Sequence, residues 1–441
     1  MANVAVSALT ELLGASLDAN ADALLVSDMS ARLSKRMTPA NIMRASLYNL
    51  TSVYDFTTGS LGPFVSFTRA STGWYRDSVG AIAAALTDVP RFQYDPVALT
   101  PRGLLVEQST TNQFAYSDAL NDASWVKVRT SAPVADGYGT MDKLVEDTNG
   151  STHNVSRTSS LVAGTTYCFE AYAKHAGRDF LTFVLNTLVT GGGTVRSYFN
   201  INTGALGTGS AYLTESIEHV GNGVYRCSAL VTSIYTGSGS LVFYEMAQVN
   251  NNANYTGDGV SGLFLGGMSL TDCASLTSPI LTTTAGATRA ADEVRIANPA
   301  ALIDQCWIVK ARTPRKLIGV AENVAFQVDD GTGANARVLI HGTDGVLYAI
   351  TTVGGVINCF ISLGAVAGDT DFTVAVRWAD NNFAASLNGG AVVTDTSGLN
   401  PLGLTTARVG SGAGTNYWNS TIRRIETRRT ASNAELQALS V

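Results

Sequence analysis

Charged side chains are scarce in this sequence. They make up 15% of its 441 residues, against about 25% in an average soluble domain. Lysine and glutamate, on which long exposed helices depend, are few, whereas glycine, serine and threonine are abundant. The formal net charge is -6, and a nucleic-acid-binding protein normally presents a basic face. These shortages argue against a mainly helical protein and against a nucleic-acid partner.

Clustered cysteines are also absent. The five cysteines stand far apart, at positions 168, 227, 273, 306 and 359, and none forms a C-x-x-C motif or a Cys/His cluster with metal-ligand spacing. We therefore expect no metal site and no disulfide framework, but reduced and mostly buried thiols. A cross-strand disulfide between Cys168 and Cys227 is the alternative, because both stand in expected strands.

Long hydrophobic runs and sequence repeats are missing as well. The first residues lack the charged start and apolar stretch of a signal peptide, and no window approaches about 20 apolar residues. We therefore expect no signal peptide and no membrane insertion. The sequence shows no repeat of fixed period and no heptad pattern, which argues against a solenoid and a coiled-coil stalk.

No constellation of catalytic side chains is recognisable. Glycoside hydrolysis needs two carboxylates about 5 to 10 Å apart, but the acidic residues are scattered and mostly stand in turn-like sequence. The four histidines have no neighbouring serine or cysteine motif, and no G-x-S-x-G is present. We predict that the protein is not an enzyme and has no catalytic residues and no cofactor.

Short strands with alternating polar and apolar residues fill the last three quarters of the chain. This period-two alternation, bounded by Gly, Asn or Ser turns, runs through 113–288 and again through 289–441. Clear examples are 166–174, 180–185, 224–231, 307–312 and 372–378. The predicted fold class is mainly β, with a β-sandwich in each of the two segments.

Two local signals near the C-terminus predict a turn and a helix. Asn388-Gly389 follows an expected strand and is typical of a tight β-hairpin turn. A short closing helix is expected over 431–439, with Thr430 or Ser432 as its N-cap.

The first quarter of the chain divides into two parts. Residues 1–57 predict a small α/β module, with strands over 23–27 and 32–37 and a helix that begins at Pro39. Residues 58–112 form a turn-rich junction with many aromatic residues. We expect these aromatics to pack as core rather than to form a sugar platform.

Several motifs resemble those of bacteriophage fibre and spike proteins. The series FTRAST (67–72), VPRFQYDP (89–96) and GLLVEQSTTN (103–112) resembles a junction in that class. Residues 1–57 resemble the N-terminal module of phage tail fibres. The motifs GTTYCFEAYAK, FNINTG and VGNGVYRC resemble a carbohydrate-binding-like jelly roll of phage head and tail fibres. The order VAVRW, AASLNG, WNSTIRRI resembles a concanavalin-A-like or laminin-G-like lectin sandwich.

This resemblance implies a protein on the exterior of a phage particle, assembled in the host cytoplasm. It would be a homotrimeric tail fibre that attaches to other virion proteins through residues 1–57 and binds a host cell-surface glycan. A capsid fibre or decoration protein is the alternative that shares the same motifs, and a glycan-depolymerising spike is a further one.

One loop near the C-terminus is the candidate glycan-binding site. Asn416, Tyr417, Trp418 and Asn419 follow a glycine-rich stretch, and they combine aromatic rings with amides. An aromatic ring can stack on the apolar face of a sugar while amides bond its hydroxyl groups. The alternative is that these residues pack in the core.

Overall fold

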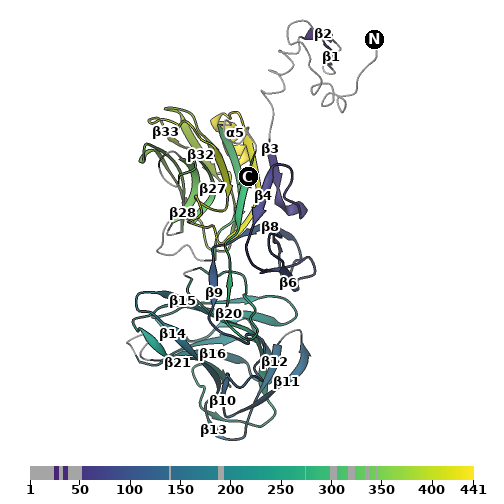
Figure 1. Ribbon diagram of the computed structural model, residues 1–441, viewed down its shortest axis with the longest axis vertical. Coiled ribbons are helices and arrows are strands. Elements are labelled where there is room, and N and C mark those ends of the chain that lie inside the picture. The colour runs from purple at the N-terminus through teal and green to yellow at the C-terminus, as the bar shows by residue number, and fades with distance from the viewer. Residues whose placement is uncertain are drawn as a thin grey trace.

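The protein is mainly β, as predicted, and two β-sandwiches follow one another along its long axis (Figure 1). No helix in the described part of the chain is long and apolar enough to cross a membrane. This computed structural model describes residues 24–28, 33–37, 52–138, 141–186, 193–273, 275–297, 305–315, 323–332, 335, 337–343 and 345–441.

The central sandwich comprises strands β10 to β23 and has one hydrophobic core between two antiparallel sheets. Alternation along each strand turns every second side chain inward, so Phe169, Phe183 and Tyr244 meet in that core. The first sheet has the order β10 (Val126–Val128), β14 (His153–Leu161), β21 (Gly237–Ala247), β16 (Phe180–Leu185), β17 (Val195–Asn200), β18 (Ala205–Leu206). The second sheet has the order β11 (Thr130–Tyr138), β12 (Met141–Glu146), β23 (Gly262–Thr271), β15 (Thr166–Ala176), β20 (Val224–Thr232), β19 (Thr214–His219).

The terminal sandwich is built from two segments that lie far apart in the sequence. Its core contains Phe56 and Phe67 from the first segment and Trp307 and Phe326 from the second. One sheet has the order β30 (Val356–Ala365), β29 (Val346–Val353), β28 (Arg337–Thr343), β27 (Asn323–Asp329), β34 (Thr406–Val409), β25 (Glu293–Ile296), β4 (Val65–Thr68). The other has the order β33 (Val393–Asp395), β32 (Phe383–Leu387), β31 (Asp371–Arg377), β26 (Cys306–Arg312), β35 (Ser420–Arg428), β8 (Pro101–Val106), β7 (Phe92–Tyr94), and β3 (Ser52–Asp55) also pairs with β35.

The central sandwich is an insertion into the terminal sandwich. The chain leaves through β9 (Thr110–Asn112) and returns through β24 (Ala287–Arg289), and these two strands pair antiparallel with each other. Figure 1 shows β9 at the waist between the two lobes. The point of exit and the point of return are therefore side by side, and the seam between the sandwiches is a paired β-ribbon.

Strand pairing assigns the predicted junction to the terminal sandwich. β4, β7 and β8 lie in its two sheets, and the hairpin of β5 (Gly73–Arg76) and β6 (Ile82–Ala85) projects beside them. The division at residue 57 therefore cuts through one folded unit, because Tyr54 and Phe56 lie in the terminal core.

Most of the predicted N-terminal module lies outside the described residues. Its two strands are described: β1 (Leu24–Asp28) pairs antiparallel with β2 (Leu33–Met37), close to the predicted ranges. The helix expected from Pro39 falls outside the described part of the chain.

The local signals near the C-terminus are confirmed. Asn388 and Gly389 have positive φ angles of 49° and 70°, and the Gly390 N–H donates to the Leu387 carbonyl at 2.9 Å, so the pair forms a β-turn in the connection between β32 and β33, which pair as far as Ala385 and Val393. The closing helix is α5 (Asn433–Leu439), and Ser432 is its N-cap. The Ser432 side chain accepts a hydrogen bond from the Glu435 backbone N–H, and the Glu435 carboxylate accepts one from the Ser432 N–H, which completes a capping box.

All five cysteines are free and buried. In the ladder between β15 and β20, Cys168 lies opposite Leu230 and Cys227 lies opposite Ala171. The two cysteines are therefore three positions out of register and point to opposite faces of the sheet. A disulfide between them would require the strands to shift, because a disulfide needs Cβ atoms about 4 Å apart.

We expect the five thiols to be inert in the folded protein. Burial raises the pKa of each of them, in Cys306 and Cys359 to about 12, and the thiolate is the reactive form. Iodoacetamide at mildly alkaline pH should leave all five unmodified in native protein and modify all five after denaturation, as mass spectrometry would show. Rapid modification of native protein would contradict this burial.

Candidate functional site

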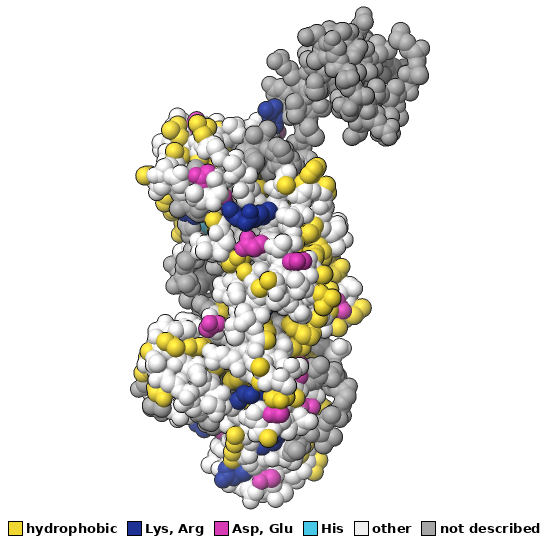
Figure 2. Space-filling model, in the orientation of Figure 1, with side chains coloured by type: hydrophobic (Ala, Val, Ile, Leu, Met, Phe, Trp, Pro, Cys, Tyr) yellow, Lys and Arg dark blue, Asp and Glu magenta, His cyan; other side chains and the backbone are white. Residues whose placement is uncertain are grey.

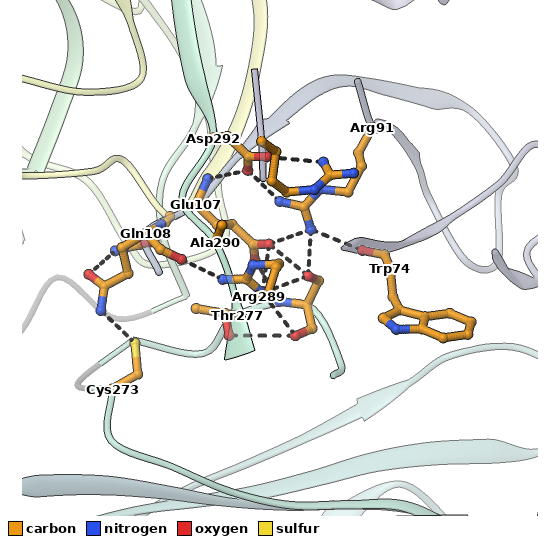
Figure 3. A network of polar contacts seen from close by, with 12 residues as sticks. Trp74, Arg91, Glu107, Gln108, Cys273, Thr277, Arg289, Ala290 and Asp292 are labelled. Carbon is orange, nitrogen blue, oxygen red and sulfur yellow. Dashed lines mark hydrogen bonds and ion pairs between the residues drawn. The ribbon is translucent and has the colours of Figure 1, made fainter. Parts of the chain in front are cut away.

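Five charged side chains are fully buried at the seam between the two sandwiches (Figure 3). Each has at most 1% of its surface exposed. They are Arg69, Arg91, Glu107, Arg289 and Asp292. We call these residues the seam cluster.

The seam cluster is a continuous network of ion pairs. Arg91 contacts both acids: its Nη1 lies 2.7 Å from Glu107 Oε2, and its Nη2 bonds Asp292 Oδ2. Arg69 Nη1 lies 3.2 Å from Asp292 Oδ1, and Arg289 Nη1 lies 3.1 Å from Glu107 Oε2. Because buried charges are costly unless they are paired and hydrogen-bonded, these five residues hold one another in place.

Backbone carbonyl groups stabilise the surplus positive charge of the cluster. Arg69 Nη2 donates to the carbonyl oxygens of Ala85, Leu86 and Val89, at 2.9, 2.8 and 3.1 Å. These three residues form the end of β6 and the loop after it, so one guanidinium fixes the base of the β5–β6 hairpin.

The cluster also ties the central sandwich to the terminal one. Ser278, which follows the last strand of the central sandwich, donates through its hydroxyl to Glu107 Oε2 at 2.6 Å. Arg289 Nη2 donates to the Gln108 carbonyl at 2.8 Å. The motif residues that the sequence singled out, Arg69, Arg91 and Glu107, are therefore residues of the seam.

The seam cluster predicts a characteristic response to acid. Burial of Glu107 opposes ionisation, but Arg289, Arg91 and the hydrogen bonds from Ser278 outweigh it and lower its pKa to about 2. A carboxyl with a depressed folded-state pKa stabilises the fold fully above its unfolded-state pKa, near 4.3, and the stabilisation is lost as pH falls toward about 2.

We therefore expect the stability difference between wild type and Glu107→Gln to be constant above about pH 5 and to shrink as pH falls below about 4. Urea unfolding at a series of pH values measures it. A difference that does not change down to pH 2 would contradict the assigned pKa shift.

The structure places the predicted glycan contact Trp418 in the core. None of its surface is exposed, its ring lies edge-on to Phe372 at 5.8 Å, and its Nε1 donates to the Arg312 carbonyl at 2.7 Å. A sugar cannot stack on a ring with no exposed face, so Trp418 is a packing residue of the terminal sandwich. Trp418 stands two residues before β35 (Ser420–Arg428), and its ring packs into the core of the terminal sandwich.

The neighbours of Trp418 also have structural contacts. The Tyr417 hydroxyl donates to Glu293 Oε1. Asn419 is buried, and its Oδ1 accepts from the Gln108 N–H at 2.9 Å. Asn416 is partly buried and adopts a positive φ of 53°, and its carbonyl accepts from the Val324 N–H. Asn419 also lines a cavity of about 90 Å³ at the seam, but the four residues together shape a turn and do not expose a shared binding surface.

A cleft of about 490 Å³ lies elsewhere along the seam. We call it the seam cleft. The β5–β6 hairpin of the terminal sandwich forms one wall, and the second sheet of the central sandwich forms the other, so neither sandwich contains the cleft alone. Its lining includes Trp74, Arg76, Ile82, Asp118, Met141, Tyr172, Val220, Asn222, Val224, Gly267.

The floor of the seam cleft is apolar and rigid. Met141, Tyr172, Val220 and Val224 are buried and pack together, with Ile82 against them. Gly267 makes room for this floor: a Cβ atom there would lie 2.6 Å from Tyr172 Cδ2, and the residue has a φ of +59°. The Tyr172 ring can lie in place only because this position is glycine.

Polar groups and one half-buried aromatic side chain surround that floor. The Trp74 carbonyl accepts from Arg91 at 3.0 Å, and Figure 3 shows its indole ring turned away from the seam cluster. The Arg76 guanidinium lies over the Tyr172 ring, 5.5 Å from the centroid. Asp118 and Asn222 also line the cleft. An indole, a carboxylate, a guanidinium and an amide around an apolar floor suit a molecule with one apolar face and several hydroxyl groups.

The seam cleft does not contain the groups for glycoside hydrolysis. Asp118 is the single carboxylate among its described lining residues, whereas that reaction uses two. No group of three or more His, Cys, Asp or Glu side chains that could hold a metal occurs in the described ranges.

The sequence did not identify Trp74 as a site residue, because the aromatics of 58–112 were expected to pack as core. That expectation holds for Phe67, but Phe64 has 63% of its surface exposed and Trp74 is only half-buried. The sequence does contain one local signal for a binding role of Trp74. It follows Gly73 and stands two residues before Arg76, so that an aromatic ring and a guanidinium occur close together.

No protein-family model matches the chain, and no curated protein matches it. Among solved structures, it is similar to the Ruminococcus gnavus IT-sialidase CBM40 bound to α2,3 sialyllactose, with 18% identity over 32% of this chain and 84% of that chain and a TM-score of 0.27.

Two laminin structures are also similar. Domains LG4-5 of the mouse laminin α1 chain have 7% identity over 66% of this chain and 90% of that chain, with a TM-score of 0.23. The LG1-3 region of the laminin α2 chain has 9% identity over 76% of this chain and 65% of that chain, with a TM-score of 0.15. At such low scores, these likenesses carry no argument about what the chain binds.

Proposed function

We propose that this chain is a non-enzymatic attachment protein that binds a glycan in the seam cleft. The observation that carries this proposal is the cleft itself: about 490 Å³ between two sandwiches, with an apolar floor, the Trp74 indole and several polar side chains around it. Ligand sites are typically concave, mostly apolar and supplied with a few polar groups, and they often lie between domains.

The wider role that we propose is that of a phage tail fibre. The resemblance of the sequence motifs supports this role. Of the predicted module 1–57, residues 1–51 would be the attachment segment, because β3 (Ser52–Asp55) pairs with β35 of the terminal sandwich. Protein lacking residues 1–51 should fold but fail to incorporate into particles. Normal incorporation of that truncated protein would exclude the role of this segment.

We also propose that the protein assembles as a homotrimer. Large hydrophobic side chains are exposed in and around the junction strands, and Figure 2 shows hydrophobic side chains gathered along one edge of the molecule near the seam. The exposed hydrophobic side chains of the junction include Phe64 (63% exposed), Val79 (73%), Leu86 (68%) and Val97 (56%). Exposed apolar surface of this kind favours contact between subunits. Light scattering at micromolar concentration should give the mass of a trimer, and a stable monomer would contradict it.

The same exposed side chains favour the alternative, a capsid fibre or decoration protein whose sandwiches contact neighbouring subunits. Electron microscopy of virions labelled with an antibody to this chain would separate tail placement from head placement.

A glycan array probed with the intact protein tests the proposed binding. Wild type should bind a defined subset of saccharides, and Trp74→Ala should lower the affinity for them by about tenfold, since loss of an aromatic stacking partner costs about 1 to 1.5 kcal/mol. The Trp74 carbonyl, which accepts from Arg91, is retained in this variant. Tyr212→Ala is the matched control, because Tyr212 is a 52% exposed aromatic residue that does not line the cleft. Unchanged binding by Trp74→Ala would reject the cleft as the site.

A further inference from the structure

A second cavity adjoins the seam cleft. It has a volume of about 90 Å³ and also lies between the two sandwiches. Arg76, Ile82, Tyr172 and Val220 line both spaces, so the two share a wall. Of these four side chains Tyr172 and Val220 are buried, whereas Arg76 is only partly buried and lies over the Tyr172 ring at the boundary of the two spaces.

Arginine dominates this second cavity. Five arginines and three carboxylates stand among its described lining residues. The arginines are Arg76, Arg102, Arg226, Arg312 and Arg315, and the carboxylates are Glu107, Glu218 and Asp369. We call this space the arginine cavity.

The carboxylates of the arginine cavity already have cationic partners. Asp369 Oδ1 lies 2.7 Å from Arg312 Nε, and its Oδ2 lies 3.5 Å from Arg315 Nη2. Glu218 bonds Arg315, and Glu107 belongs to the seam cluster.

Acids outside the cavity hold three of its arginines as well: Arg226 bonds Glu170, Arg102 pairs with Asp95, and Arg312 pairs with Asp371. Among the described residues, Arg76 is the lining arginine without an ion pair.

Two guanidinium donors in this cavity lack an acceptor. Arg226 Nε and Arg315 Nη1 are buried, and neither finds a hydrogen-bond partner among the described residues. Buried donors without an acceptor are costly, and the planar fork of a guanidinium matches the two oxygens of a carboxylate. Arg226 and Arg315 thus keep unused donors beside the cavity, and Arg76, which is only partly buried, is the guanidinium that an incoming carboxylate can meet.

We propose that the glycan bound in the seam cleft is acidic, and that its carboxylate enters the arginine cavity while its ring lies on the cleft floor. This inference rests on the proposed glycan-binding function. Arg76 would give the site its preference for acidic sugars. Its guanidinium lies over the Tyr172 ring and lines both spaces, where it can contact the ring substituents and the carboxylate of one sugar residue.

The test uses the full chain on an array that carries each acidic saccharide beside its carboxyl-reduced counterpart. We expect the acidic member of a pair to bind at least about tenfold more tightly, because a hydrogen bond to a charged group is about twice as strong as one between neutral groups. Raising the ionic strength should weaken binding of the acidic saccharide and leave binding of its neutral counterpart unchanged. This salt comparison needs no variant and therefore does not depend on whether a mutant folds.

Two variants then test whether Arg76 causes the preference for acidic saccharides. Arg76→Gln should lower affinity for the acidic member by about tenfold and change that for its neutral counterpart less than twofold. Arg295→Gln is the matched control, because the Arg295 side chain is exposed, lies on β25 and lines neither space. It should bind like wild type.

The outcomes separate the two claims. Equal binding of acidic and reduced saccharides, or equal loss of both in Arg76→Gln, would overturn the acidic specificity and leave the glycan-binding function standing. Binding of no saccharide on the array would overturn the proposed function, and the inference with it.

Discussion

Asp292→Ala should be among the most destabilising single substitutions in this protein. Asp292 is fully buried, contacts Arg69 and Arg91, and accepts from the Glu107 backbone N–H at 2.9 Å. Its removal would leave three buried arginines with one carboxylate. Breaking a buried pair from one side costs about 3 to 5 kcal/mol.

Equilibrium urea unfolding measures this loss, and both sandwiches should unfold at lower urea than in wild type because the cluster joins them. Asp272→Ala is the control, since Asp272 is exposed and should change the free energy of unfolding by less than about 0.5 kcal/mol. A loss below about 1 kcal/mol for Asp292→Ala would show that the seam cluster does not hold the sandwiches together.

Trp418→Ala is expected to have an effect of similar size for a different reason. The indole is fully buried in the terminal core, and its N–H donates to the Arg312 carbonyl. Replacing a buried tryptophan with alanine costs about 3 to 5 kcal/mol, because apolar surface is lost and a cavity remains.

The comparison with Trp74→Ala distinguishes the two tryptophans. Trp74 is only half-buried, so its substitution should cost much less stability and should affect glycan binding instead. A Trp418→Ala protein with wild-type stability and no glycan binding would contradict the packing role and restore Trp418 as the binding residue.

Local features of this fold could be predicted from the sequence because they depend on neighbouring residues. Alternation over 180–185 and 224–231 predicted β16 and β20, and the Ser432 cap with Glu435 produced the closing helix. The insertion of one sandwich into the other could not be predicted in this way. It depends on pairing between β9 and β24, strands that lie at opposite ends of the inserted segment.

The burial of the predicted contact Trp418 depends on long-range packing and could not be predicted from the sequence. Trp418 and its amides form a typical sugar-binding composition, but their burial is decided by strands that pack on them from elsewhere in the chain. Trp74 reaches the seam cleft because Arg69 and Asp292, 223 positions apart, fix the hairpin base against the second half of the terminal sandwich. The hydrophobic periodicity of the sequence cannot predict a contact between residues so far apart in the chain.

A crystal structure of the protein with a saccharide selected on the array tests the central claim most directly. Our account predicts density for the sugar in the seam cleft, with a ring against Trp74 and over the Tyr172 floor, between the two sandwiches. Density for the saccharide at the 416–419 turn or on the outer face of either sandwich, with the seam cleft empty, would contradict it.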